Sequence, residues 1–160
     1  PKIFELLDSI DWNKILPDKS TRFHGDLHFE NIICNKNENG FEFKLLDWRQ
    51  DFGGNINFGD IYYDLAKLNH NLTFNHDLVS KGYYKVDFKP DGVEVDILRS
   101  DKLVRCKKIF YDFLAEYNYD SKKVDILTSL IWINMSPLHE GELKPFLFYF
   151  GKFYLNECVS

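Results

Sequence analysis

A chain of 160 residues, of which 44% are hydrophobic and 17% aromatic, can bury a core of its own, so we expect one globular domain and not a disordered segment. The formal net charge is -5 and the basic residues are scattered, which argues against a nucleic-acid-binding surface. No apolar run reaches membrane-spanning length and the N-terminus does not resemble a signal peptide, so we expect a cytoplasmic protein with no membrane partner.

The first half of the chain predicts two short helices, a hairpin and a longer helix. Apolar residues from Phe4 to Leu16 recur at loose helical spacing, and Pro17 closes this segment. Two β-prone runs, 31–35 and 41–46, flank the turn-forming sequence KNENG and predict a hairpin. A segment rich in Gly and Asn follows, and then Asp60 is a suitable N-cap for a helix that reaches Leu72.

The second half predicts another hairpin and three helices. Residues 83–88 and 93–98 alternate apolar and polar side chains around Pro90-Asp91-Gly92, a strong turn signal. Helices are expected over 101–117, 121–135 and 143–157, with Ser121 as a cap and Pro137 as a break. The predicted fold class is therefore α+β and mostly helical, with two hairpins.

A cluster of oxygen-bearing side chains surrounds the first hairpin. Asp26 and Asn31 precede its first strand, and Asp47 follows its second. Because a hairpin folds back on itself, Asn31 and Asp47 should lie at adjacent strand ends, close enough to share a metal ion. Carboxylate and amide oxygens suit Mg²⁺ better than zinc. A metal and a nearby carboxylate that accepts a hydroxyl proton are the groups that phosphoryl transfer needs.

Three motifs in this region resemble those of a known family. They are His24-Gly25-Asp26 followed by Asn31, then Leu45-Leu46-Asp47-Trp48, and then Gly59-Asp60-Ile61-Tyr62-Tyr63-Asp64-Leu65-Ala66. In this order they resemble the aminoglycoside phosphotransferase and choline kinase superfamily, whose catalytic loop is itself similar to that of protein kinases. The resemblance covers residues 23–68.

The resemblance implies a role for each matching residue. Asp26 is the catalytic base, and Asn31 and Asp47 bind Mg²⁺ and, through it, ATP. His28 contacts phosphate or hydrogen-bonds within the loop. His24 and Asp64 hold the backbone of the loop. Outside the matching motifs, Arg49 and Asp51 are candidate contacts for the hydroxyl acceptor, with a surface ion pair as the simpler alternative. The acceptor is a small molecule: a sugar, an amino alcohol such as choline, or an aminoglycoside.

The resemblance also implies a protein-kinase-like C-terminal, catalytic lobe over residues 1–160. No glycine-rich loop and no strand lysine of the kinase type precede Phe23, so we expect the N-terminal nucleotide lobe to be absent from this chain. The favoured explanation is that this lobe belongs to the same parent chain and is a partner, and the alternative is a natural half-kinase that has lost it. The isolated chain should then show little ATP turnover. It should also expose an apolar patch near the first hairpin.

Two other classes of function remain as alternatives. Asp26-Leu27-His28, Gly59-Asp60 and Asn75-His76-Asp77 are similar to the metal-binding blocks of calcineurin-like phosphoesterases, although Phe74 stands where those proteins have Gly. A paired metal site at Asp26, His28, Asp60 and His76 would support that class. The third class is a non-catalytic, pseudokinase-like lobe that binds a partner.

Overall fold

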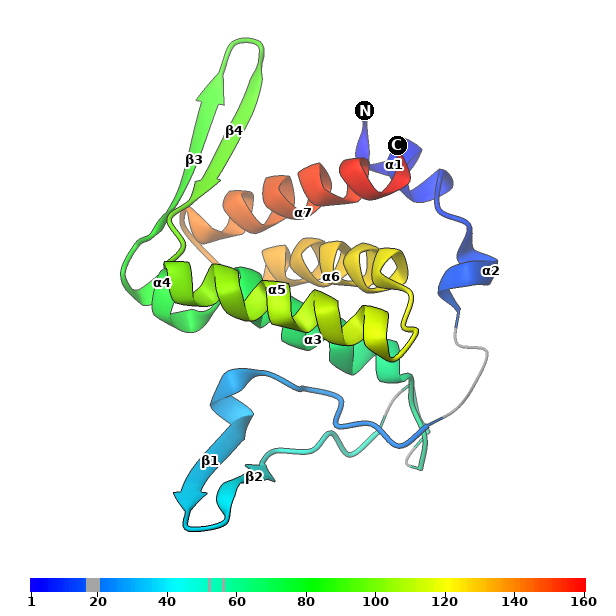
Figure 1. Ribbon diagram of the computed structural model, residues 1–160. Coiled ribbons are helices and arrows are strands. Elements are labelled where there is room, and N and C mark those ends of the chain that lie inside the picture. The colour runs from blue at the N-terminus through cyan, green and yellow to red at the C-terminus, as the bar shows by residue number, and fades with distance from the viewer. Residues whose placement is uncertain (17–20, 52, 56) are drawn as a thin grey trace.

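The computed structural model describes residues 1–16, 21–51, 53–55 and 57–160. It is an α+β structure in which 53% of the described residues are helical, so helices dominate as predicted (Figure 1). The strands of the described residues form two separate antiparallel hairpins. None of the helices in these residues is both long and apolar enough to cross a membrane.

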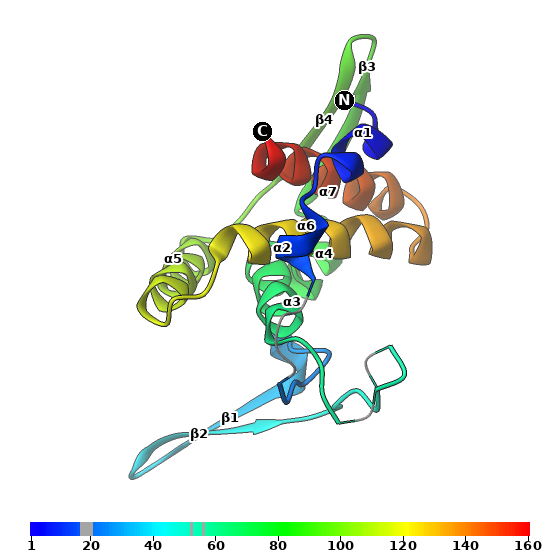
Figure 2. The ribbon, with the colours of Figure 1, turned by 90° about the vertical axis from the view of Figure 1, so that its right-hand side faces the viewer.

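Four long helices form the body of the molecule. They are α3 (Ile61–Thr73), α5 (Asp101–Glu116), α6 (Ser121–Met135) and α7 (Leu143–Val159). Helix α6 lies in the middle, with α3 on one side and α7 on the other (Figures 1 and 2). Each of these helices begins and ends within two residues of its predicted bounds, because apolar periodicity and caps are local signals.

Side-chain caps fix the first turns of three of these helices. The carboxylates of Asp60 and Asp120 accept the N–H groups of Tyr62 and Lys123, and Ser100 caps α5 in the same way. The prediction that Ser121 caps α6 is wrong, because Asp120, one residue earlier, does so. A carboxylate at this position adds a favourable interaction with the helix dipole to the hydrogen bond.

The core is aromatic where α6 meets α7. Trp132 of α6 is buried against Phe150 of α7, with ring centroids 4.7 Å apart. Gly151, the next residue of α7, lies so close to α6 that an added Cβ would sit 2.8 Å from both Cγ1 of Ile133 and the carbonyl oxygen of Ser129. Glycine therefore permits the close approach of these two helices.

The N-terminal segment covers one end of the helical body. Helices α1 (Ile3–Asp8) and α2 (Trp12–Ile15) are short, as the sequence predicts, and the predicted break at Pro17 lies outside the described residues. The buried residues of this contact are Leu6, Ile10, Ile15, Ile126 and Leu155. The two short helices are thus held by α6 and α7.

The first hairpin stands apart from the helical body. Strands β1 (Ile32–Asn37) and β2 (Gly40–Leu45) pair in a register that places Ile32 opposite Leu45. Cross-strand partners share a face of a hairpin, so one face is mostly apolar; it carries Ile32, Cys34, Phe41, Phe43 and Leu45. Phe41 and Phe43 are 66% and 63% exposed, so the expected apolar patch is present.

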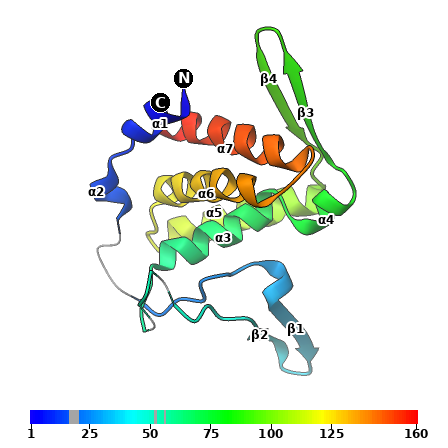
Figure 3. The same cartoon turned by 180° about the vertical axis from the view of Figure 1, so that it is seen from behind.

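The second hairpin lies at the opposite end of the molecule (Figures 1 and 3). Strands β3 (Tyr84–Lys89) and β4 (Gly92–Ile97) turn at the predicted Pro90-Asp91 pair. Before them lies helix α4 (His76–Ser80), which the sequence did not predict because five residues are too few for a periodic pattern. Asn75 caps α4 by accepting the N–H of Leu78.

Candidate functional site

The segment from Thr21 to Asn31, named here the Asp26 loop, lies beside the N-terminus of α3. Thr21 and Gly59 form a two-bond antiparallel bridge, with N···O distances of 3.0 and 2.8 Å. Gly25 has φ +85°, and an added Cβ there would sit 2.5 Å from Cβ of Arg49. The loop therefore needs glycine at this position, both for its backbone conformation and for its contact with Arg49.

One face of α3 holds the Asp26 loop at three points. Asp64 accepts the backbone N–H groups of His24 and Gly25, at 2.5 and 2.7 Å. Lys67 pairs with Asp26, with Nζ 2.7 Å from Oδ1. Asn71 accepts the N–H of Phe29 at 3.0 Å. Positions 64, 67 and 71 follow the helical spacing i, i+3 and i+7, so a single helix face sets the course of the loop.

The buried ring of His24 joins the loop to the end of β2. Its Nδ1 accepts the N–H of Asp26 at 3.2 Å, so the ring proton belongs on Nε2, which donates to the carbonyl oxygen of Leu46 at 2.7 Å. The carbonyl oxygen of His24 accepts the N–H of Arg49 at 2.9 Å. His24 thereby fixes the position of the residues on both sides of Asp47.

Asp26 lies in a partly buried, positively charged setting. Its side chain is 27% exposed and that of Lys67 is 13% exposed. Partial burial raises the pKa of the Asp26 carboxyl, but the hydrogen bond and charge of Lys67, with the charges of His28 and Arg49, outweigh it and hold the pKa below its usual value. Asp26 is therefore ionised at neutral pH.

Asn31 and Asp47 lie at adjoining ends of the first hairpin. The N–H of Leu46 donates to the carbonyl oxygen of Asn31 at 2.9 Å, which extends the strand ladder by one pair and leaves Asp47 directly beyond it. The amide nitrogen of Asn31 donates to the carbonyl oxygen of Asp26 at 3.0 Å. The backbone of Asp47 has φ +54°, an uncommon conformation for a residue other than glycine and one that is frequent at functional sites.

His28 is held between two neighbours of the loop. Its Nδ1 lies 2.8 Å from a carboxylate oxygen of Glu30, and its Nε2 lies 3.1 Å from the amide nitrogen of Asn31. The nearer oxygen of Asp26 is 3.4 Å from Nε2. Glu30 also contacts the ring of His76, at 3.4 Å. With Nδ1–H directed to Glu30, Nε2 is the acceptor for Asn31.

Arg49 and Asp51 have different surroundings. The side chain of Arg49 packs on Gly25, and its charge contributes to the low pKa of Asp26, so it lies near the loop. Asp51 accepts the N–H of Gly54 at 3.2 Å, as a turn residue does. Of the two candidate acceptor contacts, only Arg49 has a contact with the Asp26 loop among those found in the described residues.

Lys67 is the residue in contact with Asp26 that the sequence interpretation missed; Asn71 and Glu30, which contact other parts of the loop, were missed as well. A lysine in the middle of a predicted amphipathic helix is usually a solvated residue. The available signal was its spacing, since Lys67 follows Asp64 by three residues and therefore lies on the same helix face.

Asp60 stands apart from the other residues of the phosphoesterase alternative, of which Asp26 and His28 lie 3.4 Å apart and the rings of His28 and His76 lie 6.2 Å apart. Asp60 caps α3, and its other carboxylate oxygen lies 4.0 Å from Nζ of Lys123. It thus stands about 10 Å along the helix axis from Lys67, which holds Asp26. Within the part of the chain that the structure describes, no group of three or more His, Cys, Asp or Glu side chains is arranged to hold a metal ion.

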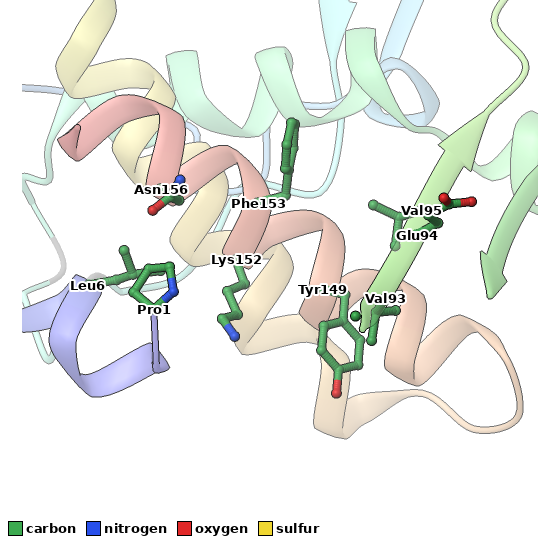
Figure 4. A pocket seen from close by; sticks show the side chains of 10 residues that line it. Pro1, Leu6, Val93, Glu94, Val95, Tyr149, Lys152, Phe153 and Asn156 are labelled. Atoms are coloured by element: carbon green, nitrogen blue, oxygen red, sulfur yellow. The ribbon is translucent and has the colours of Figure 1, made fainter. Parts of the chain in front are cut away.

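A surface groove of about 490 Å³ lies far from the Asp26 loop, between β4, α7 and the N-terminal segment (Figure 4). Its walls include the aromatic rings of Tyr149 and Phe153. In Figure 1, α3, α5 and α6 lie between these elements and the first hairpin. The groove therefore adds no residue to the Asp26 site.

Comparisons of this chain with models of protein families, with curated proteins and with solved structures found no match.

Proposed function

We propose that this chain is the catalytic lobe of an ATP-dependent phosphotransferase, which transfers the γ-phosphate of ATP to a hydroxyl group of a small molecule. The observation that carries the proposal is the placement of Asn31 and Asp47 at adjoining strand ends, with Asn31 bonded to the backbone of Asp26. An amide oxygen and a carboxylate for the metal, beside a carboxylate for the acceptor proton, are the groups that phosphoryl transfer uses.

Asn31 and Asp47 fit a magnesium ion. The amide nitrogen of Asn31 is used within the loop, so its side-chain oxygen would hold the ion, and Asp47 would add an exposed carboxylate. Mg²⁺ keeps several waters and binds through one or two protein groups together with substrate phosphates, so two residues suffice. When bound, the ion neutralises charge on the phosphate oxygens of ATP.

Asp26 is the group that receives the proton of the acceptor. Its Oδ1 is paired with Lys67, which leaves Oδ2 for the hydroxyl group. The hydroxyl oxygen forms a bond to the γ-phosphorus, while the bond from that phosphorus to the bridging oxygen of ATP breaks. ADP leaves with the bridging oxygen, and the hydroxyl proton passes to Asp26. The proposed acceptors are sugars, amino alcohols such as choline, and aminoglycosides.

The proposed fold is a protein-kinase-like C-terminal lobe, with a nucleotide lobe of the same parent chain as its partner. The apolar face of the first hairpin supports this pairing, because Phe41 and Phe43 are largely exposed and the hairpin stands beside the proposed metal ligands. An isolated two-stranded hairpin is at best marginally stable in water. A lobe packed on this face would bury its apolar side chains and hold the hairpin in place.

Metal binding can be tested without turnover. Mn²⁺ added to the chain as a paramagnetic probe should broaden the amide NMR signals of residues 31 and 47 first. Asp47→Asn should weaken this binding strongly, because it removes the ligand charge while Asn tolerates the backbone conformation of Asp47. Asp112→Asn, which changes an exposed carboxylate on α5, is the matched control. Equal broadening in all three proteins would exclude the proposed metal ligands.

Turnover is tested with Mg·ATP and a panel of sugars, amino alcohols and aminoglycosides, in a protein that carries this chain together with the proposed nucleotide lobe. Asp26→Asn should lower the rate by about 10²- to 10⁴-fold, because it removes the general base and its charge. Asp112→Asn should leave the rate unchanged. If Asp26→Asn transfers phosphate as fast as the natural protein, Asp26 is not the base.

A further inference from the structure

The carboxylate of Asp26 is held from outside its own loop. Lys67 lies on α3, and the same helix face carries Asp64 and Asn71, which accept backbone N–H groups on either side of Asp26. The three contacts therefore bind the loop before, at and after the proposed base. Helix α3 itself is fixed by its packing on α6 and α5, so it is a rigid support for the loop.

The ion pair of Lys67 with Asp26 differs from the surface ion pairs of this chain. The lysine side chain is 13% exposed, whereas that of Lys108, paired with Asp112 on α5, is 75% exposed. A charge-assisted hydrogen bond of 2.7 Å between partly buried groups is screened less by water than an exposed pair. The pair also joins two separate elements, so it constrains the direction of the Asp26 side chain.

His28 is not placed to constrain the direction of the Asp26 side chain. Its two ring nitrogens contact Glu30 and Asn31, and the nearer Asp26 oxygen lies 3.4 Å away, beyond a normal hydrogen bond. The direct contact with the carboxylate of Asp26 is thus made by Lys67 from a helix outside the loop, while the charges of His28 and Arg49 act from farther away.

We propose that Lys67 is the positioning residue of the Asp26 site: it holds Oδ1 of Asp26 and thereby directs Oδ2 towards the acceptor hydroxyl. This inference rests on the proposed phosphotransferase function. It adds a residue that the three sequence motifs do not include.

The ionisation of Asp26 tests the contact directly and needs no turnover. A ¹³C NMR titration of the Asp26 carboxyl is made in the chain and in the variants Lys67→Met, Lys67→Arg and Lys108→Met. The titration midpoint should move to higher pH in Lys67→Met, because the neighbouring charge is lost, and should stay close to its original value in Lys67→Arg and Lys108→Met. An unchanged midpoint in folded Lys67→Met would overturn the inference. If Lys67→Met does not fold, Lys67→Gln, which is polar but uncharged, replaces it.

Turnover with Mg·ATP and the acceptor panel then tests the role of Lys67 separately from the proposed phosphotransferase function, on which that role rests. In the protein that carries the proposed nucleotide lobe, Lys67→Met should lower kcat by about 10²-fold with a small change in KM for ATP, because misplacement of a catalytic group costs rate more than binding. The acid limb of its kcat/KM profile should move to higher pH, and Lys67→Arg should restore most of the rate.

The two failures look different. If Asp26→Asn removes turnover while Lys67→Met leaves both kcat and the acid limb unchanged, the role of Lys67 is wrong and the phosphotransferase function stands. If Asp26→Asn leaves turnover unchanged, Asp26 is not the base, and the role of Lys67 falls with it. If no acceptor of the panel is phosphorylated, the phosphotransferase function itself is wrong, while the titration of Asp26 still decides whether Lys67 holds its carboxylate.

Discussion

The ring of His24 donates its Nε2–H to the carbonyl oxygen of Leu46 across 2.7 Å. This bond joins the loop that carries Asp26 to the strand end that precedes Asp47. Asp47 is thereby connected to the loop that carries both Asp26 and Asn31 by a buried side chain as well as by the course of the backbone.

Replacing His24 by Phe should destabilise the chain. The ring shape is kept, but the carbonyl oxygen of Leu46 and the N–H of Asp26 lose their partner, which costs about 1–3 kcal/mol for each group left buried and unpaired. Urea unfolding measures the loss. His76→Phe, which changes a 75% exposed ring, should stay within about 0.5 kcal/mol of the original stability. Equal stability of the two variants would contradict this account of His24.

Gly25→Ala should also destabilise the chain, by about 1–3 kcal/mol. Its φ of +85° is unfavourable for alanine, and the new Cβ would collide with the Arg49 side chain at 2.5 Å. Thermal unfolding followed by circular dichroism measures the effect. The control is Gly92→Ala, because an added Cβ at Gly92 meets no atom within 4 Å. The expectation fails if Gly25→Ala unfolds at the same temperature as the control.

The chain should lose stability as the pH falls below 6.5, because His70 is buried. Burial, with smaller contributions from nearby positive charges such as Lys67, lowers the pKa of His70 to about 3. Because the pKa is lower in the folded chain, the unfolded chain binds the proton more readily. The stability that neutral His70 contributes is therefore complete above pH 6.5, which is about the pKa of His70 in the unfolded chain, and it declines as the pH falls towards 3. At pH 5 the loss amounts to about 2 kcal/mol.

Urea unfolding at pH 7 and pH 5 checks the pH dependence. Between pH 7 and pH 5 the free energy of unfolding of His70→Leu should fall by about 2 kcal/mol less than that of the original chain, because leucine has no proton to bind. Other groups titrate alike in both proteins, so the difference reports on His70. The same slope of stability with pH in both proteins would show that His70 is not the cause.

The apolar face of the first hairpin should make the isolated chain self-associate. Phe41 and Phe43 are more than half exposed on one face, and such contiguous patches favour association. Sedimentation velocity over a wide range of concentrations should show larger species, which the double variant Phe41→Glu and Phe43→Glu should abolish. Phe88→Glu, on the second hairpin and 65% exposed, is the control. Association that persists in the double variant would place the contact elsewhere.

Much of the fold follows from local signals in the sequence. The turn residues Pro90-Asp91 and the cap Asp60 determine where a hairpin bends and where α3 begins, and both act on their immediate neighbours. The neighbouring placement of Asn31 and Asp47 was also predictable, because it follows from the return of a hairpin. Helix α4 was not, because its five residues show no period.

The part of the site that the sequence did not predict depends on contacts between distant segments. Lys67 meets Asp26 only because α3 lies along the loop, and no local pattern predicts how a helix and a loop are placed. In the same way, the rings of His24 and Trp48 lie 4.9 Å apart only because the loop and the end of β2 are close. Residue identities are the basis of the proposed chemistry, which stays a prediction, and the packing of α3 determines the geometry of the site.

The glycine at position 151 offers a way to recognise distant relatives of this chain. Helices α6 and α7 meet there without space for even a methyl group. A homologue with any larger residue at the equivalent point must separate the two helices or shift one along the other. A glycine in the last helix, aligned with the Asp26 loop motifs upstream, would therefore mark sequences that share this helix pairing even when the rest has diverged.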